Sequence, residues 1–240
     1  MKAVIFAAGL GTRLQPLTND KPKALVEIAG KTLLEHAINY LKKYGIQEFV
    51  INIHHFGDLV VEYLDRHNNF GVTIHISDER QQLLNTGGGL VKMEKWLAND
   101  PFIVYNVDII TDIDLDKMVA FHIRSKALAT LAVRNRTTSR YLLFDDDNYL
   151  RGWKNMKTGE TIYTCQNAGH LNAYAFSGVH VIDPAIFQYK HEEQIFSIIH
   201  WYLDLAKDNL ISGYVHDDSF WLDVGKLSAL PLGYDYMVSK

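Results

Sequence analysis

Cysteine, proline and long apolar runs are all scarce in this chain of 240 residues. It has five prolines and only one cysteine, Cys165. Because a disulfide needs two cysteines, an intrachain disulfide cannot form and a disulfide-stapled fold is excluded. No run of apolar residues approaches the ~20 that cross a bilayer, and the apolar start is too short for a signal peptide. We therefore expect a cytoplasmic protein with no membrane partner.

Positive charge is also in short supply. Lys and Arg together number 24 against 28 Asp and Glu, which gives a net charge of -4. A chain without a basic excess is poorly suited to neutralise a nucleic-acid backbone, so any phosphate ligand should be small and held locally. The eleven histidines lack the spacing of a zinc site, and no Gly-x-Ser-x-Gly hydrolase motif is present.

Strand-length apolar runs alternate with segments of helical period in the first half. Such alternation is typical of βαβ units, and it predicts an α/β protein with a Rossmann-like three-layer sandwich and a mainly parallel mixed sheet. The predicted strands are 2–7, 49–53, 72–76 and 102–106, and the predicted helices are 32–44, 59–66 and 90–97.

The pattern changes after about Ser139. Two short runs, 141–144 and 149–153, flank an acidic turn and predict a β-hairpin, followed by a strand over 174–182 and a helix over 194–207. A last strand pair is expected around Tyr214 and Trp221, before a short terminal helix. We expect a single domain, 1–240, made of two parts, 1–138 and 139–240, the second with a small β-rich lobe and the terminal helix.

The first strand runs directly into a glycine loop, Gly9-Leu10-Gly11-Thr12-Arg13-Leu14. Backbone N–H groups of such a loop can point at a phosphate without side-chain obstruction. One alternative is the fingerprint loop of dinucleotide-binding proteins, but that loop has Gly or Ala at the position of Leu14. It also leads directly into a helix, which Pro16 and Pro22 forbid here. A Walker A loop ending at Gly30-Lys31-Thr32 requires glycine at Leu25, so both alternatives fail.

Three cations accompany this loop: Arg13, Lys21 and Lys23. A triphosphate attacked at its α-phosphorus carries several charges that must be neutralised, and arginine with lysine suits that task. The alternative is an ordinary glycine turn followed by solvated lysines.

Two aspartates each follow a predicted strand, Asp108 after 102–106 and Asp223 after Phe220-Trp221-Leu222. Ligands of open parallel sheets collect at the carboxyl ends of strands, and Mg²⁺ prefers a few carboxylates together with phosphate oxygens. Either residue could instead be an ordinary turn aspartate. The acidic run 112–116 lacks the glycine and glutamate of a calcium loop and is predicted to start a helix.

The stretches Ala7 to Thr18 and Lys21 to Val26 resemble the signature of the sugar-phosphate nucleotidyltransferases. The resemblance implies that Arg13 grips the triphosphate, that Lys23 bridges the two phosphates, and that Asp108 and Asp223 share a catalytic Mg²⁺. The sequence departs from the family at Val107, where glycine is usual. The implied catalytic residues are Arg13, Lys23 and Asp108, and the implied nucleotide-binding residues are Ala8, Gly9, Gly11, Thr12, Arg13, Lys23, Asn85, Thr86 and Gly87.

The resemblance implies that 1–138 is the nucleotide-binding part and that 139–240 is the sugar-phosphate part with the β-rich sugar-binding lobe. It also suggests the substrates. Segments 84–89, 176–181 and 221–225 are similar to those of short uridylyltransferases, which favours UTP and N-acetylmuramate 1-phosphate, with GTP and mannose 1-phosphate as the alternative pair. Asn172 is a candidate sugar contact, because it precedes the return strand. The implied partners are a nucleoside triphosphate and a sugar 1-phosphate, in a monomer or homodimer. A regulatory module that binds nucleotide or sugar phosphate without catalysis is the non-enzyme alternative.

Overall fold

The computed structural model describes residues 1–166, 169–189 and 191–240. The chain forms two compact units. The first consists of 1–84, 104–112 and 220–240, and the second of 85–103 and 113–219. The functional division at 138/139 expected from the sequence follows a different criterion and stays a prediction.

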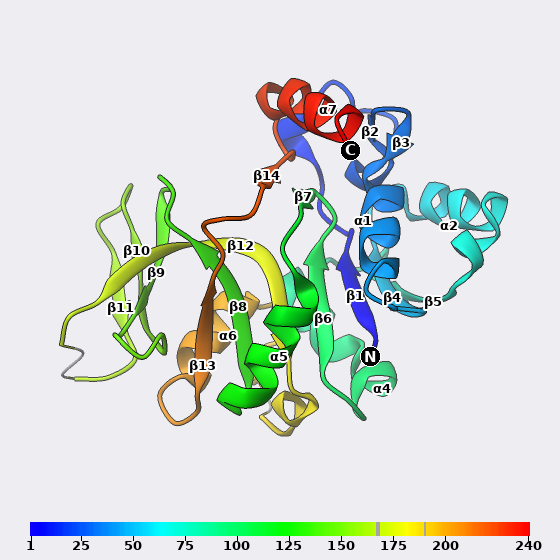
Figure 1. Ribbon diagram of the computed structural model, residues 1–240. Coiled ribbons are helices and arrows are strands. Elements are labelled where there is room, and N and C mark those ends of the chain that lie inside the picture. The colour runs from blue at the N-terminus through cyan, green and yellow to red at the C-terminus, as the bar shows by residue number, and fades with distance from the viewer. Residues whose placement is uncertain (167–168, 190) are drawn as a thin grey trace. The chain divides into compact units, whose positions relative to one another are not determined.

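A parallel sheet forms the centre of the first unit (Figure 1). β1 pairs in parallel with β4, β4 pairs in parallel with β5, and β6 lies beside β1. The residues of β1 are all buried, as expected for a central strand covered on both faces. The strands are β1 (Ala3–Phe6), β2 (Glu27–Ile28), β3 (Lys31–Thr32), β4 (Glu48–Ile53), β5 (Thr73–Asp78), β6 (Phe102–Asn106, entering from the second unit), β7 (Ile109–Thr111) and β14 (Trp221–Asp223), and the helices are α1 (Leu33–Lys42), α2 (Gly57–Arg66) and α7 (Leu230–Val238).

Local sequence explains the bounds of α1. The hydroxyl of Thr32 accepts a hydrogen bond from the backbone N–H of Glu35 at 3.1 Å, which caps the helix at its start. Gly45, with a φ of 76°, lies just beyond its end. One face is buried, as the predicted helix over 32–44 requires; it consists of Leu33, Leu34, Ala37, Ile38 and Leu41.

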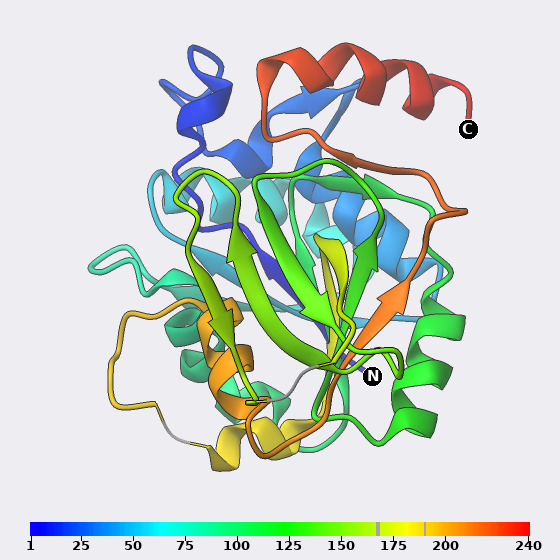
Figure 2. The ribbon, with the colours of Figure 1, turned by 90° about the vertical axis from the view of Figure 1, so that its left-hand side faces the viewer.

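The second unit is built mostly from antiparallel strands. The predicted hairpin is confirmed as β9 and β10, and the N–H of Asn148 donates to the carbonyl of Asp145 at 3.0 Å in its turn. In Figure 2, β9 and β10 lie side by side as antiparallel strands. The strands are β8 (Ala129–Arg134), β9 (Arg140–Phe144), β10 (Leu150–Asn155), β11 (Thr161–Tyr163), β12 (Asn172–Ile182) and β13 (Ile211–Val215), and the helices are α3 (Asn85–Lys92), α4 (Glu94–Leu97), α5 (Leu115–Ser125) and α6 (Ile198–Leu205).

Two element predictions were wrong in detail. The strands at Tyr214 and Trp221 do not pair with each other: β13 pairs with β8 in the second unit, and β14 pairs with β7 in the first. Strand pairing is a tertiary choice that a local pattern does not encode. The second error concerns the start of α3, which begins at Asn85 and not at residue 90. The α/β class with a mixed sheet is confirmed.

Membrane-spanning helices are lacking in the part of the chain that the structure describes.

Three histidines lie buried in the second unit, His122, His180 and His216, and the last two have strongly lowered pKa values. The Nδ1 atom of His180 lies 2.7 Å from the hydroxyl of Tyr202, and Nε2 of His216 lies 2.7 Å from the hydroxyl of Ser177. Burial lowers the pKa of His180 to about 3. Burial, helped by the charge of Arg134, lowers the pKa of His216 to about 4. Both side chains are therefore neutral in the folded protein at neutral pH.

The free energy of unfolding should fall as the pH drops below ~6.5. Unfolded histidines bind protons near that pH, whereas His180 and His216 do not bind them until the pH approaches their lowered pKa values. Each contributes a loss of up to about 1.4 kcal/mol per pH unit over that window. Urea unfolding at pH 7 and pH 5 measures the loss, and His180→Gln should make it about 1–2 kcal/mol smaller.

The exposed His170 supplies the matched control, because its side chain is 72% exposed. His170→Gln should leave the difference between pH 7 and pH 5 as in the wild type. Equal pH dependence in the wild type and in His180→Gln would contradict the prediction.

Candidate active site

The glycine loop begins where β1 ends. Ala7 and Ala8 are buried, and Gly11 has a φ of 68°, a backbone conformation that suits glycine. The carbonyl of Gly11 accepts from the N–H of Leu14 and from the hydroxyl of Thr18, both at 2.9 Å. The loop leads into a short 3₁₀ turn, Thr12–Leu14, and not into an α-helix, in agreement with the prediction from the prolines.

Lys23 turns back over this loop. It starts a second 3₁₀ turn, Lys23–Leu25, directly after Pro22. A Cβ added to Gly9 would lie 3.3 Å from its Nζ atom, so the lysine packs over the glycine backbone. Its Nζ atom lies 2.9 Å from Oδ2 of Asp108.

Asp108 occupies the turn between β6 and β7. The hydroxyl of Tyr105 donates to the carbonyl of Ile109 at 2.7 Å and closes this turn. Burial raises the pKa of Tyr105, so the hydroxyl keeps the proton that it donates. Val107, which stands where the family usually has glycine, is buried, and its N–H donates to the carbonyl of Phe6 at 3.3 Å. The chain therefore accommodates the β-branched side chain at this position.

Asp223 reaches Asp108 through strand pairing. β14 runs antiparallel to β7, with Asp223 opposite Ile109. The N–H of Val224 then donates to the carbonyl of Asp108 at 2.9 Å. Two carboxylates more than a hundred residues apart in the sequence are thus brought to one place, as predicted.

Arg13 completes the cluster. Its Nη1 atom lies 3.5 Å from Oδ2 of Asp223, and its Nη2 atom lies 3.9 Å from Oδ2 of Asp108. Its side chain is 54% exposed, so water weakens these attractions. Gly225 lies at the centre: an added Cβ would be 2.5 Å from the Asp108 carboxylate and 2.8 Å from both Arg13 and the Asp223 carboxylate. Only a residue without a side chain leaves this space open.

The donor set of the cluster suits Mg²⁺. Asp108 and Asp223 both direct carboxylate oxygens toward Gly225, and Mg²⁺ is commonly held by one or two carboxylates together with phosphate oxygens. Among the described residues no group of three or more His, Cys, Asp or Glu side chains could hold a metal ion. A zinc site of four protein ligands is therefore not supported there, whereas a magnesium site shared with a phosphate ligand fits.

The predicted base-binding segment lies in the second unit. Thr86 accepts from the N–H of Ile198 at 3.0 Å, and the N–H of Gly87 donates to the carbonyl of Phe196 at 2.9 Å. A Cβ on Gly87 would lie 2.3 Å from the Phe196 ring. Gly87 is therefore needed for packing against the residues before α6. Asn85 is exposed, and its side-chain oxygen accepts from the N–H of Thr86 at 2.8 Å.

Asn172 is the first residue of β12, also in the second unit. Its Nδ2 atom lies 3.5 Å from the carboxylate of Asp146, which also contacts the ring of His170. The side chain is partly exposed. Its role as a sugar contact stays a prediction.

The sequence analysis missed three residues of this region, Asn52, Glu79 and Gly225. Asn52 is a polar residue within the apolar strand β4, and this interruption was the signal that could have revealed it. Glu79 and Gly225 gave weaker signals, since glutamate after a strand and glycine after aspartate are common in turns.

The first unit also contains a hollow of about 530 Å³ lined by Tyr40, Tyr44, Tyr105 and neighbouring residues of α1, β7 and α7. None of Arg13, Lys23, Asp108 and Asp223 lines it. The charged cluster and this hollow are therefore separate features.

Comparison with known proteins shows the family of the chain. The family model described as "Nucleotidyl transferase" matches residues 2–150. The chain is 33% identical to N-acetylmuramate alpha-1-phosphate uridylyltransferase of Caulobacter vibrioides, over 93% of this chain and 91% of that protein. It is 41% identical to the mannose-1-phosphate guanylyltransferase catalytic subunit beta of Dictyostelium discoideum, over 51% of this chain and 34% of that protein.

The fold is also found among solved structures. A putative glucose-1-phosphate thymidylyltransferase from Bacillus anthracis superposes with a TM-score of 0.80 at 21% identity, covering 98% of this chain and 94% of the other. This likeness concerns the fold. The sequence matches carry the assignment: the chain belongs to the nucleotidyl transferase family and, as its phosphate loop predicted, to the sugar-phosphate nucleotidyltransferases, which are enzymes.

Proposed function

We propose that the protein transfers a nucleoside monophosphate from a nucleoside triphosphate to a sugar 1-phosphate and releases pyrophosphate. UTP and N-acetylmuramate 1-phosphate are the favoured substrates, on the strength of the relative from Caulobacter vibrioides that spans most of the chain. The observation that carries the proposal is the convergence of Arg13, Lys23, Asp108 and Asp223 beside the glycine loop.

The reaction needs positioning and charge stabilisation more than proton transfer. A sugar phosphate with a second pKa near ~6 is mostly dianionic at neutral pH, so its oxygen attacks the α-phosphorus without a general base. A new P–O bond forms at the α-phosphorus, the bond to the β-phosphate oxygen breaks, and pyrophosphate leaves on the opposite side. Arg13 stabilises the developing pyrophosphate, and Lys23 holds the α-phosphate and the incoming phosphate together.

Asp108 and Asp223 would hold Mg²⁺ in this scheme. The ion supplies charge neutralisation at the phosphate oxygens when it is bound. The aspartates need their fixed placement for this purpose, and the pairing of β14 with β7 provides it.

The remaining assignments concern binding. The backbone of Ala8, Gly9, Gly11 and Thr12 is proposed to bind the triphosphate. Asn85, Thr86 and Gly87 are proposed to border the base, and Asn172 to contact the sugar. The cytoplasmic location and a monomeric or homodimeric state also stay predictions.

Pyrophosphate release should occur with one pairing of nucleotide and sugar phosphate in the presence of Mg²⁺. The assay crosses UTP, GTP, CTP, dTTP and ATP with the 1-phosphates of N-acetylmuramate, mannose, glucose and N-acetylglucosamine. We expect UTP with N-acetylmuramate 1-phosphate to give the highest kcat/KM. If GTP with mannose 1-phosphate is turned over instead, the proposed substrates are wrong but the proposed reaction is right. If no pairing releases pyrophosphate, the proposed function is refuted.

Replacing a charged residue of the cluster should cost most of the activity. Arg13→Ala and Asp108→Asn should each lower kcat/KM by about 10²–10³, the usual loss when one electrostatic group of an active site is deleted. Steady-state kinetics on the active pairing measure the effect. The exposed residues Arg66 and Asp65 on α2 supply matched controls, and Arg66→Ala and Asp65→Asn should stay within about twofold of the wild type. Losses below threefold for Arg13→Ala would contradict its assigned role.

A single methyl group at Gly225 should also lower the activity strongly. The added Cβ of Gly225→Ala would lie 2.5 Å from the Asp108 carboxylate, closer than real Cβ contacts, so the two carboxylates and Arg13 must move apart. We expect at least a hundredfold loss of kcat/KM, since a misplacement of about 1 Å has that effect. Gly30, where an added Cβ has no atom within 4 Å, offers a control in Gly30→Asn, which suits its φ of 77°. Wild-type kinetics in Gly225→Ala would show that the open space is not required.

A further inference from the structure

A buried amide supports the entry to the glycine loop. Asn52, on β4, is 4% exposed. Its Oδ1 atom accepts from the N–H of Ala7 at 2.7 Å and from the N–H of Ala8 at 3.3 Å. These two residues connect β1 to Gly9, so the amide fixes the backbone from which the loop starts.

A buried carboxylate fixes the amide in turn. Glu79 is 1% exposed, and its Oε1 atom accepts from Nδ2 of Asn52 at 2.8 Å. Its Oε2 atom accepts from the N–H of Leu84 at 3.0 Å. Leu84 directly precedes Asn85, the first residue of the segment proposed to border the base. One carboxylate therefore holds the backbone of Leu84 directly and that of Ala7 and Ala8 through Asn52, next to the two segments that the proposed function assigns to nucleotide binding.

The direction of these hydrogen bonds is determined. Both oxygens of Glu79 accept, as an ionised carboxylate can, which obliges Asn52 to present its NH₂ group to Glu79 and its oxygen to Ala7 and Ala8. If the Asn52 amide were flipped, its NH₂ group would face the N–H groups of Ala7 and Ala8, and its oxygen would face the Glu79 carboxylate. Burying a carboxylate is costly unless it is fully hydrogen-bonded, so this network has one low-energy arrangement.

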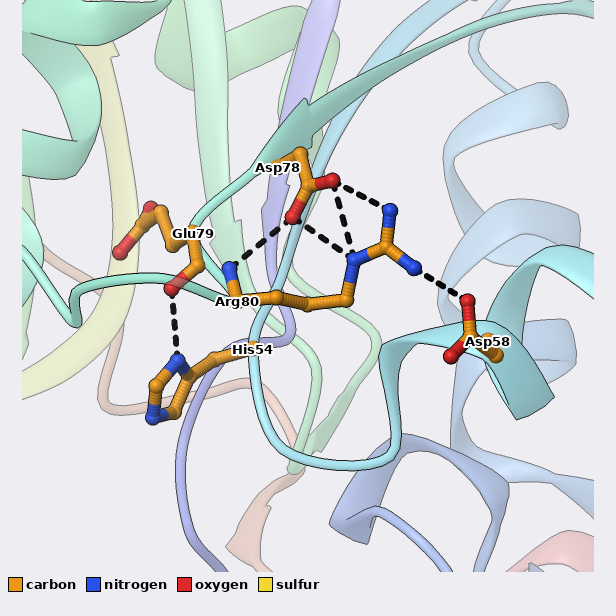
Figure 3. Close-up of polar contacts among 5 residues, drawn as sticks. All are labelled: His54, Asp58, Asp78, Glu79 and Arg80. Carbon is orange, nitrogen blue, oxygen red and sulfur yellow. Dashed lines mark hydrogen bonds and ion pairs between the residues drawn. The ribbon is translucent and has the colours of Figure 1, made fainter.

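The exposed charges next to Glu79 belong to a different network. Arg80 forms ion pairs with Asp78 and Asp58, and the Glu79 carboxylate points away from these three side chains (Figure 3). Glu79 contacts the ring of His54 through its backbone carbonyl, at 2.7 Å, and not through its carboxylate. Asp58 is 77% exposed and thus serves as a neighbouring carboxylate outside the buried network.

We propose that Asn52 and Glu79 are positioning residues that preset the backbone N–H groups of the glycine loop for a nucleoside triphosphate. The inference rests on the proposed function, because it takes the triphosphate as the ligand of that loop. Neither side chain needs to touch the nucleotide. Their effect is exerted through Ala7, Ala8 and Leu84.

Single and double exchanges of the two side chains test the direction of the network. In Glu79→Gln an NH₂ group must face a donor, either Asn52 Nδ2 or the Leu84 N–H. In Asn52→Asp a second carboxylate stands beside Glu79. Each variant should lower kcat/KM for the nucleotide about 10- to 100-fold, mainly through a higher KM for the nucleotide, with a smaller change for the sugar 1-phosphate.

The double variant N52D/E79Q restores every donor and acceptor. The carboxylate introduced at position 52 can accept from the N–H groups of Ala7 and Ala8 and from the new amide NH₂ group at position 79. The amide oxygen at position 79 can then accept from the N–H of Leu84, and the net charge equals that of the wild type. We expect the double variant to recover at least tenfold in kcat/KM over the poorer single variant.

Thermal unfolding and a control variant distinguish an effect on the position of the loop from a general loss of stability. Asp58→Asn should keep kcat/KM within twofold of the wild type. A purely structural role would lower Tm in the single variants and leave the two KM values unchanged, which would overturn the inference. Single variants within threefold of the wild type in kcat/KM would also overturn it, as would a double variant no better than the poorer single one.

Failure of the proposed function is distinguishable from failure of this inference. A wild type that is silent in every pairing removes the proposed function and the inference with it, whereas an active wild type with unaffected variants removes the inference alone. If a single variant does not fold, the double variant decides. A folded double variant with a KM for the nucleotide near that of the wild type supports the inference, and an unfolded one overturns it.

Discussion

The antiparallel pairing of β14 with β7 is the interaction on which the candidate active site depends. Asp108 and Asp223 are far apart in the sequence, and only this ladder sets Asp223 opposite Ile109 and places Val224 within hydrogen-bond reach of Asp108. The pairing also fixes Gly225 between the two carboxylates and Arg13. Packing of α7 supports it, because Gly233 allows the helix to approach Val224 and Ile110 closely.

Charge balance is the second constraint. Two carboxylates gathered at one point repel each other unless cations lie beside them. Lys23 contacts Asp108 at 2.9 Å, and Arg13 lies near both aspartates. The same two cations are the ones assigned to the phosphates of the substrates. In the proposed function these four groups exchange partners when the anionic substrates and Mg²⁺ bind.

Hydrogen bonds hold the glycine loop at its start and at Gly11. At its start, the buried pair Asn52 and Glu79 holds Ala7 and Ala8. At Gly11, a positive φ and the hydrogen bonds from Leu14 and Thr18 fix the turn. A loop held in this way has less conformational freedom to lose when a ligand binds, which reduces the entropy cost of association.

Features that depend on neighbouring residues could be predicted from the amino-acid sequence. These were the glycine loop after β1, the cations at positions 13 and 23, the helix over 32–44, and the β9–β10 hairpin, because turn chemistry and periodicity are local. Contacts in the folded chain were needed to establish which strand pairs with β14, that Asn85 to Gly89 is helical against Phe196, and that Asn52 and Glu79 form a buried pair. Those outcomes depend on residues distant in the chain, and the pattern of one segment does not specify its partner.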